Sequence, residues 1–213
     1  PRKAAGVGFL RHFLTKSKEM ANKEAIAGVL DVSKTMWNRL PSGERGIDVG
    51  KSFLKRLLMQ KVLASKTHEC CIVLAGTTET RNDLNSPEAP DDYQHGTEAI
   101  RMDRIGTEAI RALESAEESI AEDECDIVDG IVVALNQLHK RTVGKNGAPK
   151  KYKRSVYLVT DARSRIRAAQ DLGPIHNSMR NENMPVRLLV VGIDFDANAT
   201  NLKEDIASAN PED

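Results

Sequence analysis

The run of residues 25–35 constrains the fold more than any other stretch. Residues 25–30 are all apolar or glycine, Asp31 ends the run, and the hydroxyl residues Ser33 and Thr35 follow. A continuous apolar run bounded by charge is typical of a strand buried on both faces, as in a parallel sheet covered by helices. Ligands of such sheets collect beyond the carboxyl ends of the strands. We therefore expect a central strand here, with Asp31, Ser33 and Thr35 on the loop best placed to bind a ligand.

Length and composition narrow the class of protein. A chain of 213 residues with 40% hydrophobic residues buries one core of ordinary size, so one folded domain is expected. The 31 acidic and 31 basic residues cancel, which leaves no overall field favouring nucleic acid or a membrane, and no apolar run is long enough to span one. Cys70 and Cys71 are adjacent in an apolar run, where neighbouring side chains point to opposite faces. We predict reduced core cysteines rather than disulfides.

Residues 1–19 differ from the sequence that follows them. Five lysines and arginines alternate there with valine, phenylalanine and leucine, and Glu19 is the only acid. A transit peptide, an appended or fused leader and a partner-binding arm all have this mixture. We favour an appended leader, because Met20 begins a run that resembles a natural start just before the first strand. The expected organisation is a basic and apolar leader at 1–19 and one domain at 20–213.

Apolar runs and helical periodicities alternate along the rest of the chain. Strands are predicted at 25–31, 70–75, 155–160 and 186–191, and helices at 47–64, 126–140 and 164–179, the last with a weak point at Gly173-Pro174. The hexamer Gly-Thr-Glu-Ala-Ile-Arg occurs twice, and we interpret residues 96–101 as a strand and residues 106–111 as the start of a helix. The alternation predicts an α/β fold with a doubly wound, mostly parallel sheet flanked by helices. The polar loop at 79–95 is of a length that usually has a function.

Two predicted strands end in aspartate. Asp31, with Ser33 and Thr35, and Asp161 would bring carboxylates and hydroxyls to neighbouring strand ends, a set of hard oxygen ligands suited to Mg²⁺. An aspartyl nucleophile for phosphoryl transfer is a second possibility, although no glycine-rich phosphate loop follows the first strand. Asp and Ser after a strand also commonly cap the next turn. The histidines and cysteines do not have zinc-site spacing.

The motif Asp31-Val32-Ser33-Lys34-Thr35, with a later strand ending at Asp161, resembles the von Willebrand factor A domain and its metal-ion-dependent adhesion site. A closer resemblance is to the amino-terminal domain of the large subunit of the Ku heterodimer. It is carried by collinear blocks between residues 20 and 191, at 22–25, 30–36, 72–82, 93–95, 126–130 and 160–165.

The Ku resemblance implies a nuclear protein of non-homologous end joining that also acts at telomeres, and a domain without enzymatic activity or an obligatory cofactor. The implied partners are the small Ku subunit, DNA ends and Ku-binding peptides of repair factors. The first two contacts would belong to sequence outside this chain. The resemblance also implies a docking groove for short basic and apolar peptides, formed by Leu84, Tyr93, Asp126 and Val132. Residues 1–19 are similar in kind to such peptides, which suggests a fused ligand.

The sequence differs from metal-binding A domains at one position that affects metal binding. Many metal-binding A domains have a threonine where this chain has Cys125, and a thiol is a poor ligand for a hard cation. The alternative function is nevertheless a metal-dependent adhesion-type A domain that binds an acidic ligand through Mg²⁺ held by Asp31, Ser33, Thr35 and Asp161. A phosphoryl-transfer enzyme using Asp31 ranks third.

Overall fold

The structure is a computed structural model that describes residues 23–117, 126–164, 166 and 169–195. The leader at 1–19 and Cys125 lie outside the described residues, so the predictions that concern them stay predictions. Within the described residues, no helix has the length and apolarity needed to cross a membrane.

Five strands form one sheet in the order β3-β2-β1-β4-β5. They are β1 (Glu24–Asp31), β2 (Glu69–Ala75), β3 (Gly96–Arg104), β4 (Lys153–Thr160) and β5 (Val186–Gly192). The pairs of β1 with β2, β1 with β4 and β4 with β5 are parallel, whereas β3 is antiparallel to β2. The predicted doubly wound, mostly parallel sheet with the first strand at its centre is confirmed.

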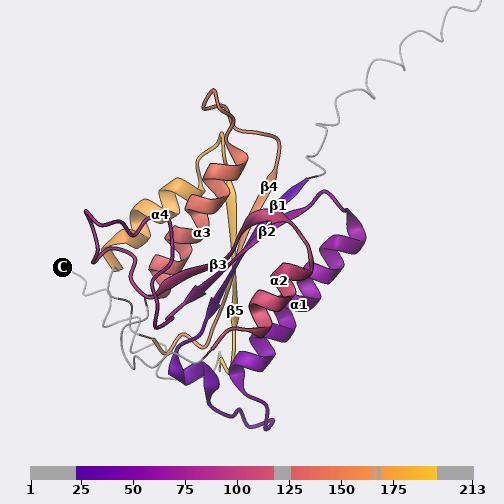
Figure 1. The fold of residues 1–213 in the computed structure, drawn as a ribbon, viewed down its shortest axis with the longest axis vertical. Coiled ribbons are helices and arrows are strands. Elements are labelled where there is room, and N and C mark those ends of the chain that lie inside the picture. Colours follow the sequence, from indigo (N-terminus) through magenta and orange to yellow (C-terminus); the bar gives the residue numbers. More distant parts are fainter. Residues whose placement is uncertain (1–22, 118–125, 165, 167–168, 196–213) are drawn as a thin grey trace, which may run out of the picture.

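Helices cover both faces of the sheet (Figure 1). On one face lie α1 (Gly46–Ala64) and α2 (Thr107–Glu114), and on the other lie α3 (Ile127–Thr142) and α4 (Leu172–Met179). The two copies of the repeated hexamer adopt different structures, as predicted. The first copy is in β3, where it pairs with β2, and the second begins α2. Tertiary pairing therefore decides between strand and helix for identical residues.

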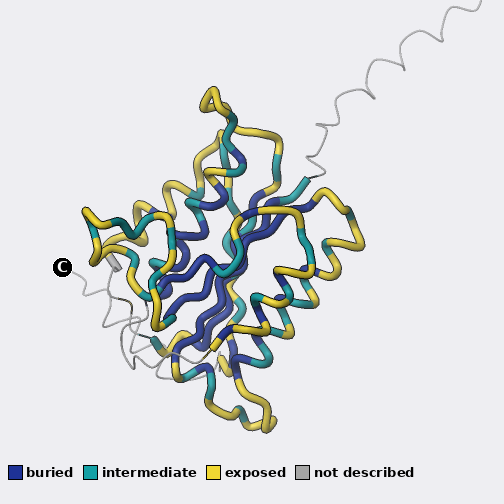
Figure 2. The backbone as a smooth tube through the Cα atoms, viewed as in Figure 1, coloured by how far each residue is buried: buried dark blue, intermediate teal, exposed yellow. Residues whose placement is uncertain are grey.

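Alternate residues of β1 serve two separate cores, because successive side chains in a strand point to opposite faces. Ala25, Ala27 and Val29 pack toward α3, while Ile26 and Leu30 pack toward α1. Figure 2 shows the resulting buried sheet between more exposed helices. The central strands are therefore buried on both sides, which explains their continuous apolar sequence.

Both large helices approach the sheet closely at a glycine. A Cβ on Gly50 of α1 would lie 2.9 Å from Val159 Cγ1, and one on Gly130 of α3 would lie 2.9 Å from Ala75 Cβ. Larger residues at either position would push a helix off the sheet.

The predicted helix at 164–179 is wrong in its first half. Ser164 and Ile166 are not helical, a short 3-10 helix, η2 (Ala169–Asp171), follows, and α4 begins at Leu172. Pro174 gives the physical reason. It is the third residue of α4, where a backbone N–H has no partner within the helix, whereas a start at 164 would place it in the interior. A second 3-10 helix, η1 (Lys34–Trp37), was not predicted and follows Ser33.

Candidate functional site

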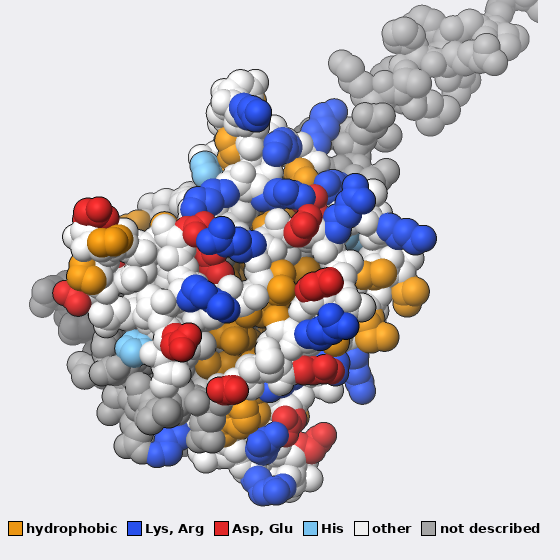
Figure 3. Space-filling view, viewed as in Figure 1, with side chains coloured by type: hydrophobic (Ala, Val, Ile, Leu, Met, Phe, Trp, Pro, Cys, Tyr) orange, Lys and Arg blue, Asp and Glu red, His pale blue; other side chains and the backbone are white. Residues whose placement is uncertain are grey.

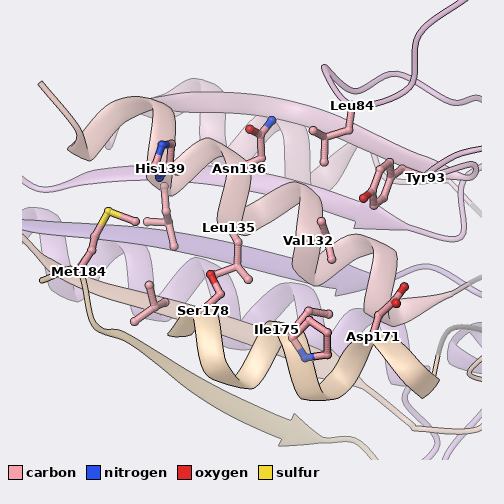
Figure 4. Close-up of a pocket in the computed structure, with 13 residues that line it drawn as sticks. Leu84, Tyr93, Val132, Leu135, Asn136, His139, Asp171, Ile175, Ser178 and Met184 are labelled. Carbon is pink, nitrogen blue, oxygen red and sulfur yellow. The ribbon is translucent and has the colours of Figure 1, made fainter. Parts of the chain in front are cut away.

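A groove of about 520 Å³ lies between the loop after β2, α3 and α4. Leu84 and Tyr93 come from the loop, Val132 and Leu135 from α3, and Ile175 from α4 (Figure 4). Leu84, Tyr93, Val132 and Leu135 are partly buried and pack against the core on the α3 side of the sheet. The groove is therefore a continuation of the hydrophobic core to the surface, with room for apolar side chains of a ligand.

Asn82 holds the loop side of this groove in place. Its Nδ2 donates to the carbonyl oxygens of Tyr93 and Gly96, each at 2.9 Å, while its Oδ1 accepts from the amide nitrogens of Leu84 at 3.0 Å and Asn85 at 2.9 Å. One side chain thus joins the two ends of the loop that carry Leu84 and Tyr93. Side-chain hydrogen bonds to the backbone are the usual way in which asparagine fixes a turn.

Tyr93 itself has a left-handed backbone, with φ of 51°. Residues other than glycine adopt this conformation only where the surrounding contacts impose it. The hydrogen bond from Asn82 to the Tyr93 carbonyl is one such contact. The tyrosine ring is therefore placed by the loop rather than by a regular element.

Acidic groups lie near Tyr93 at the groove. Burial raises the pKa of Tyr93, and the negative charges of Asp129 and Asp171 raise it further. Asp171, at the end of η2, is also one of the lining residues. An apolar groove with carboxylates at its edge is complementary to a ligand that combines apolar and basic groups.

Asn136 of α3 adds a polar group to the wall of the groove. Its Nδ2 is buried and has no hydrogen-bond partner among the described residues. A buried donor without a partner costs free energy, and a ligand carbonyl can recover it.

Three of the four residues that the Ku resemblance implied for the groove come together in it, and the fourth does not. Asp126 is buried at the start of α3, where its Oδ1 accepts a hydrogen bond of 2.8 Å from the Val128 amide, and it is not among the lining residues. The carboxylate acts as an N-cap, which satisfies a helix amide that would otherwise lack a partner. The groove acid in this structure is Asp171.

The second candidate site lies at the carboxyl ends of β1 and β4. Asp31 is fully buried, and its two carboxylate oxygens accept hydrogen bonds from the Ser33 amide at 2.9 Å and the Thr160 hydroxyl at 2.6 Å. The hydroxyls of Ser33 and Thr35 are 3.2 Å apart. The predicted gathering of Asp31, Ser33 and Thr35 is therefore present.

Asp161 completes this second site. Its Oδ1 accepts a hydrogen bond of 3.0 Å from the Arg163 amide, while its Oδ2 is buried without a hydrogen-bond partner among the described residues. Burial raises the pKa of Asp31, and hydrogen bonds from Ser33 and Thr160 oppose that shift. The negative charge of Asp161 also raises the pKa of Asp31. Two buried carboxylates and two hydroxyls are hard donors, so the residues present fit a divalent cation.

This second site offers few charged ligands for a metal ion. Among the described residues, no group of three or more His, Cys, Asp or Glu side chains gathers where it could hold a metal ion. A cation here would depend on hydroxyl groups and water for most of its ligands, which favours weak binding.

A family model described as the Ku70/Ku80 N-terminal alpha/beta domain matches residues 25–205. The chain belongs to this Ku family. The X-ray repair cross-complementing protein 5 of Dictyostelium discoideum is 28% identical to it over 177 residues, covering 81% of this chain and 20% of that protein. The ATP-dependent DNA helicase II subunit 2 of Chaetomium globosum is 26% identical over 189 residues, covering 87% of this chain and 24% of that protein. The Ku domain thus spans about a fifth to a quarter of the length of these relatives.

A solved structure supports the fold of this Ku domain. The crystal structure described as the SpRpn10 VWA domain matches with a TM-score of 0.55 and 16% sequence identity, covering 89% of this chain and 84% of that one. At this identity the likeness concerns the fold alone. It confirms the von Willebrand factor A architecture that the strand-end motif predicted.

Two groove residues of the Ku domain were missed by sequence reasoning. Asn136 carries no motif, and Asp171 lies in the segment that was predicted as the middle of a helix. The only available signal for Asp171 was the following Gly173-Pro174 pair, which marks a helix boundary.

Proposed function

We propose that this Ku domain is a non-enzymatic docking module of a nuclear protein of DNA double-strand-break repair by non-homologous end joining and of telomere maintenance. Its ligands are short basic and apolar peptides of repair factors, bound in the groove of Leu84, Tyr93 and Val132. The observation that carries the proposal is the groove itself, which is apolar along its floor and acidic at its edge. The Ku family membership supplies the cellular context.

Each part of the groove has a role toward such a peptide. Leu84, Tyr93 and Val132 surround an aromatic or aliphatic anchor, since buried side chains of this kind supply most of the affinity of small interfaces. The Asn136 amide donates to a carbonyl of the peptide backbone. Asp171 pairs with a lysine or arginine of the ligand, and charge-assisted hydrogen bonds of this type also fix orientation.

The other partners of the whole protein are assigned to sequence outside this chain. The small Ku subunit would be contacted there. DNA ends would be contacted there too, because the chain has a formal net charge of zero and lacks the excess of cations that drives counterion release from DNA. No membrane contact is proposed.

The test is calorimetric titration of residues 20–213 with a synthetic peptide of residues 1–19. Saturable binding that is unchanged by EDTA supports a docking groove and identifies the leader as a ligand. The Asp171→Asn variant should bind about 1.4- to fivefold more weakly, since an exposed ion pair contributes about 0.2–1 kcal/mol. Asp103→Asn, an exposed acid on β3 outside the groove, is the matched control. Equal affinity of both variants would show that Asp171 does not contact the peptide. No binding at about 1 mM peptide would show that residues 1–19 are not a ligand of the groove.

A second candidate function is a weak Mg²⁺ site for an acidic ligand, held by Asp31, Ser33, Thr35 and Asp161. The observation that favours it is the buried Asp161 Oδ2, which has no hydrogen-bond partner in the part of the chain that the structure describes. Calorimetry with Mg²⁺ and Mn²⁺ should then show binding that Asp161→Asn removes, while the fold measured by circular dichroism is kept. Absence of heat at millimolar metal would contradict a metal site.

A further inference from the structure

The end of α1 exposes an apolar patch that is separate from the peptide groove. Met59, Val62 and Leu63 are 59%, 37% and 86% exposed, although all three are large apolar residues. Together with Leu58, with Ile105 just before α2 and with Ile110 of α2, they line a groove of about 320 Å³. Figure 3 shows hydrophobic side chains gathered on this side of the molecule, over α1. We call this the α1–α2 groove.

The pattern along α1 shows that these residues are additional to the core. Leu54 and Leu58 face the sheet and are almost completely buried, whereas Met59, Val62 and Leu63 extend the apolar surface around the helix toward solvent. Single exposed apolar residues are common on proteins, but contiguous ones usually mark an interaction site. Of the lining residues of the α1–α2 groove, only Thr107 has a polar side chain.

The segments that form this groove are strongly basic. Residues 56–66 and 104–111 contain five lysines and arginines and a single acid, Glu108. Lys61 pairs with Glu24 at 2.5 Å. The other four cations are exposed and form no ion pair within the described part of the chain; they are Arg56, Lys66, Arg104 and Arg111. The Glu108 carboxylate lies beside Gly106 of the groove and offsets one of these charges, so the segments around the apolar groove keep an excess of positive charge, which we call the positive rim.

This charge selects among the possible occupants. Residues 1–19 contain five cations and one acid, so the rim repels them. A second copy of the chain, packed through the same surface by two-fold symmetry, would bring the four cations of one copy against those of the other. Acidic residues beside an apolar surface are complementary to the rim, and like charges across an interface disfavour the wrong partners.

We propose that the α1–α2 groove binds an amphipathic helix of a partner protein, with an apolar ridge in the groove and acidic residues on both flanks. The groove runs between the ends of two helices, and its volume is at the lower end of the range for binding pockets, about 300–1,000 Å³. It accommodates the side chains of one ridge rather than a whole helix, which is the geometry of helix-in-groove recognition. This site lies on the opposite face of the sheet from the peptide groove.

The probe is a fluorescein-labelled helical peptide of about 16 residues, with leucines repeating at i, i+3, i+4 and i+7 and glutamates on the flanks. Fluorescence anisotropy with the whole chain should show saturable binding that weakens as salt increases, because rim charges are screened. A matched peptide with lysine in place of each glutamate should bind at least about tenfold more weakly. Equal binding of both peptides, or no saturation at about 1 mM of the acidic one, would overturn the proposal.

Substitution of Leu63 locates the site. Because this side chain is 86% exposed, Leu63→Glu should fold normally, and it should weaken binding of the acidic peptide by about tenfold or more. Leu172→Glu, which makes the same change at a 45% exposed leucine of α4, should bind like the parent chain. Unchanged affinity of Leu63→Glu would contradict the assignment. A dimer that sedimentation velocity detects in the parent and that Leu63→Glu abolishes would also overturn it, in favour of a second copy.

Discussion

Replacement of Tyr93 by alanine is expected to weaken binding of the peptide of residues 1–19 by about 30-fold or more, the loss typical of an aromatic anchor at an interface centre. Tyr93 lies between Leu84 and the α3 wall of the groove, so its removal takes away one side of the anchor pocket. Tyr93→Phe keeps the ring and should stay within about threefold of the parent affinity if the ring, rather than the hydroxyl, makes the contact. Both affinities are measured by calorimetry.

Controls separate loss of the pocket from loss of the fold. Met59→Ala, a 59% exposed residue of α1 on the opposite face of the sheet, should leave the affinity unchanged. The thermal midpoint of Tyr93→Ala should remain near that of the parent chain, because the ring is only partly buried. Equal affinity of Tyr93→Ala and the parent would mean that the peptide binds elsewhere on the domain.

The sequence predicts the sheet well for a physical reason. Apolar runs such as residues 25–30 are buried on both faces. A surface strand or an amphipathic helix would need polar residues on its exposed side, so neither fits such a run. The split between β3 and α2 was also predicted correctly, although the two hexamers are identical. Their surroundings differ, since the residues after the first copy continue the strand to Arg104 and the residues after the second copy continue the helix to Glu114.

The groove could be predicted only in part. The resemblance to Ku supplied Leu84, Tyr93 and Val132, whereas composition and spacing gave no reason to join them. Asp126 was expected in the groove but serves as a helix cap. An aspartate immediately before a helix can accept a hydrogen bond from a backbone amide of the first turn, and this local bond competes with a contact to a ligand in the groove. Asp171 and Asn136 come to line the same groove only when α4 packs beside α3, and no pattern in the sequence records that packing.

The loop after β2 could not be predicted from the sequence either. Asn82 is one of several polar residues in a polar stretch, and nothing in the sequence distinguishes it from Asn85. In the structure it makes four hydrogen bonds that place both Leu84 and Tyr93. Positioning residues of this kind act through backbone geometry, which is set by the whole loop rather than by residue type.

The amino ends of the strands contain a buried carboxylate that is expected to dominate the acid response of the domain. Glu69, at the start of β2, is 2% exposed. Its carboxylate accepts two hydrogen bonds from Arg141 of α3, at 2.8 and 3.0 Å, one from Lys23 at 2.7 Å and one from the Tyr152 hydroxyl at 3.0 Å. One side chain thereby links β2 to α3 and to the chain just before β1 and β4.

These hydrogen-bond partners determine the pH range in which Glu69 is ionised. Burial alone would raise the pKa of Glu69, but the hydrogen bonds from Arg141 and Lys23 outweigh it and hold the pKa at about 2, below its usual value of 4.5. A carboxyl group whose pKa is lowered by folding stabilises the folded state while it is ionised. Its contribution is complete above the unfolded-state pKa near 4.5 and is lost as the pH falls through about 2.

The Glu69→Gln variant is therefore expected to lose about 2–3 kcal/mol of unfolding free energy at pH 7, because Arg141 and Lys23 keep their charges without the opposite one. Urea denaturation between pH 7 and 2 measures the effect. The difference between parent and variant should shrink as the pH falls from about 4.5 toward 2, since the parent then loses the same charge. Glu114→Gln, which breaks the exposed pair with Lys55, is the matched control and should follow the parent curve. A difference that stays constant across this pH range would show that the ionised form of Glu69 does not stabilise the fold.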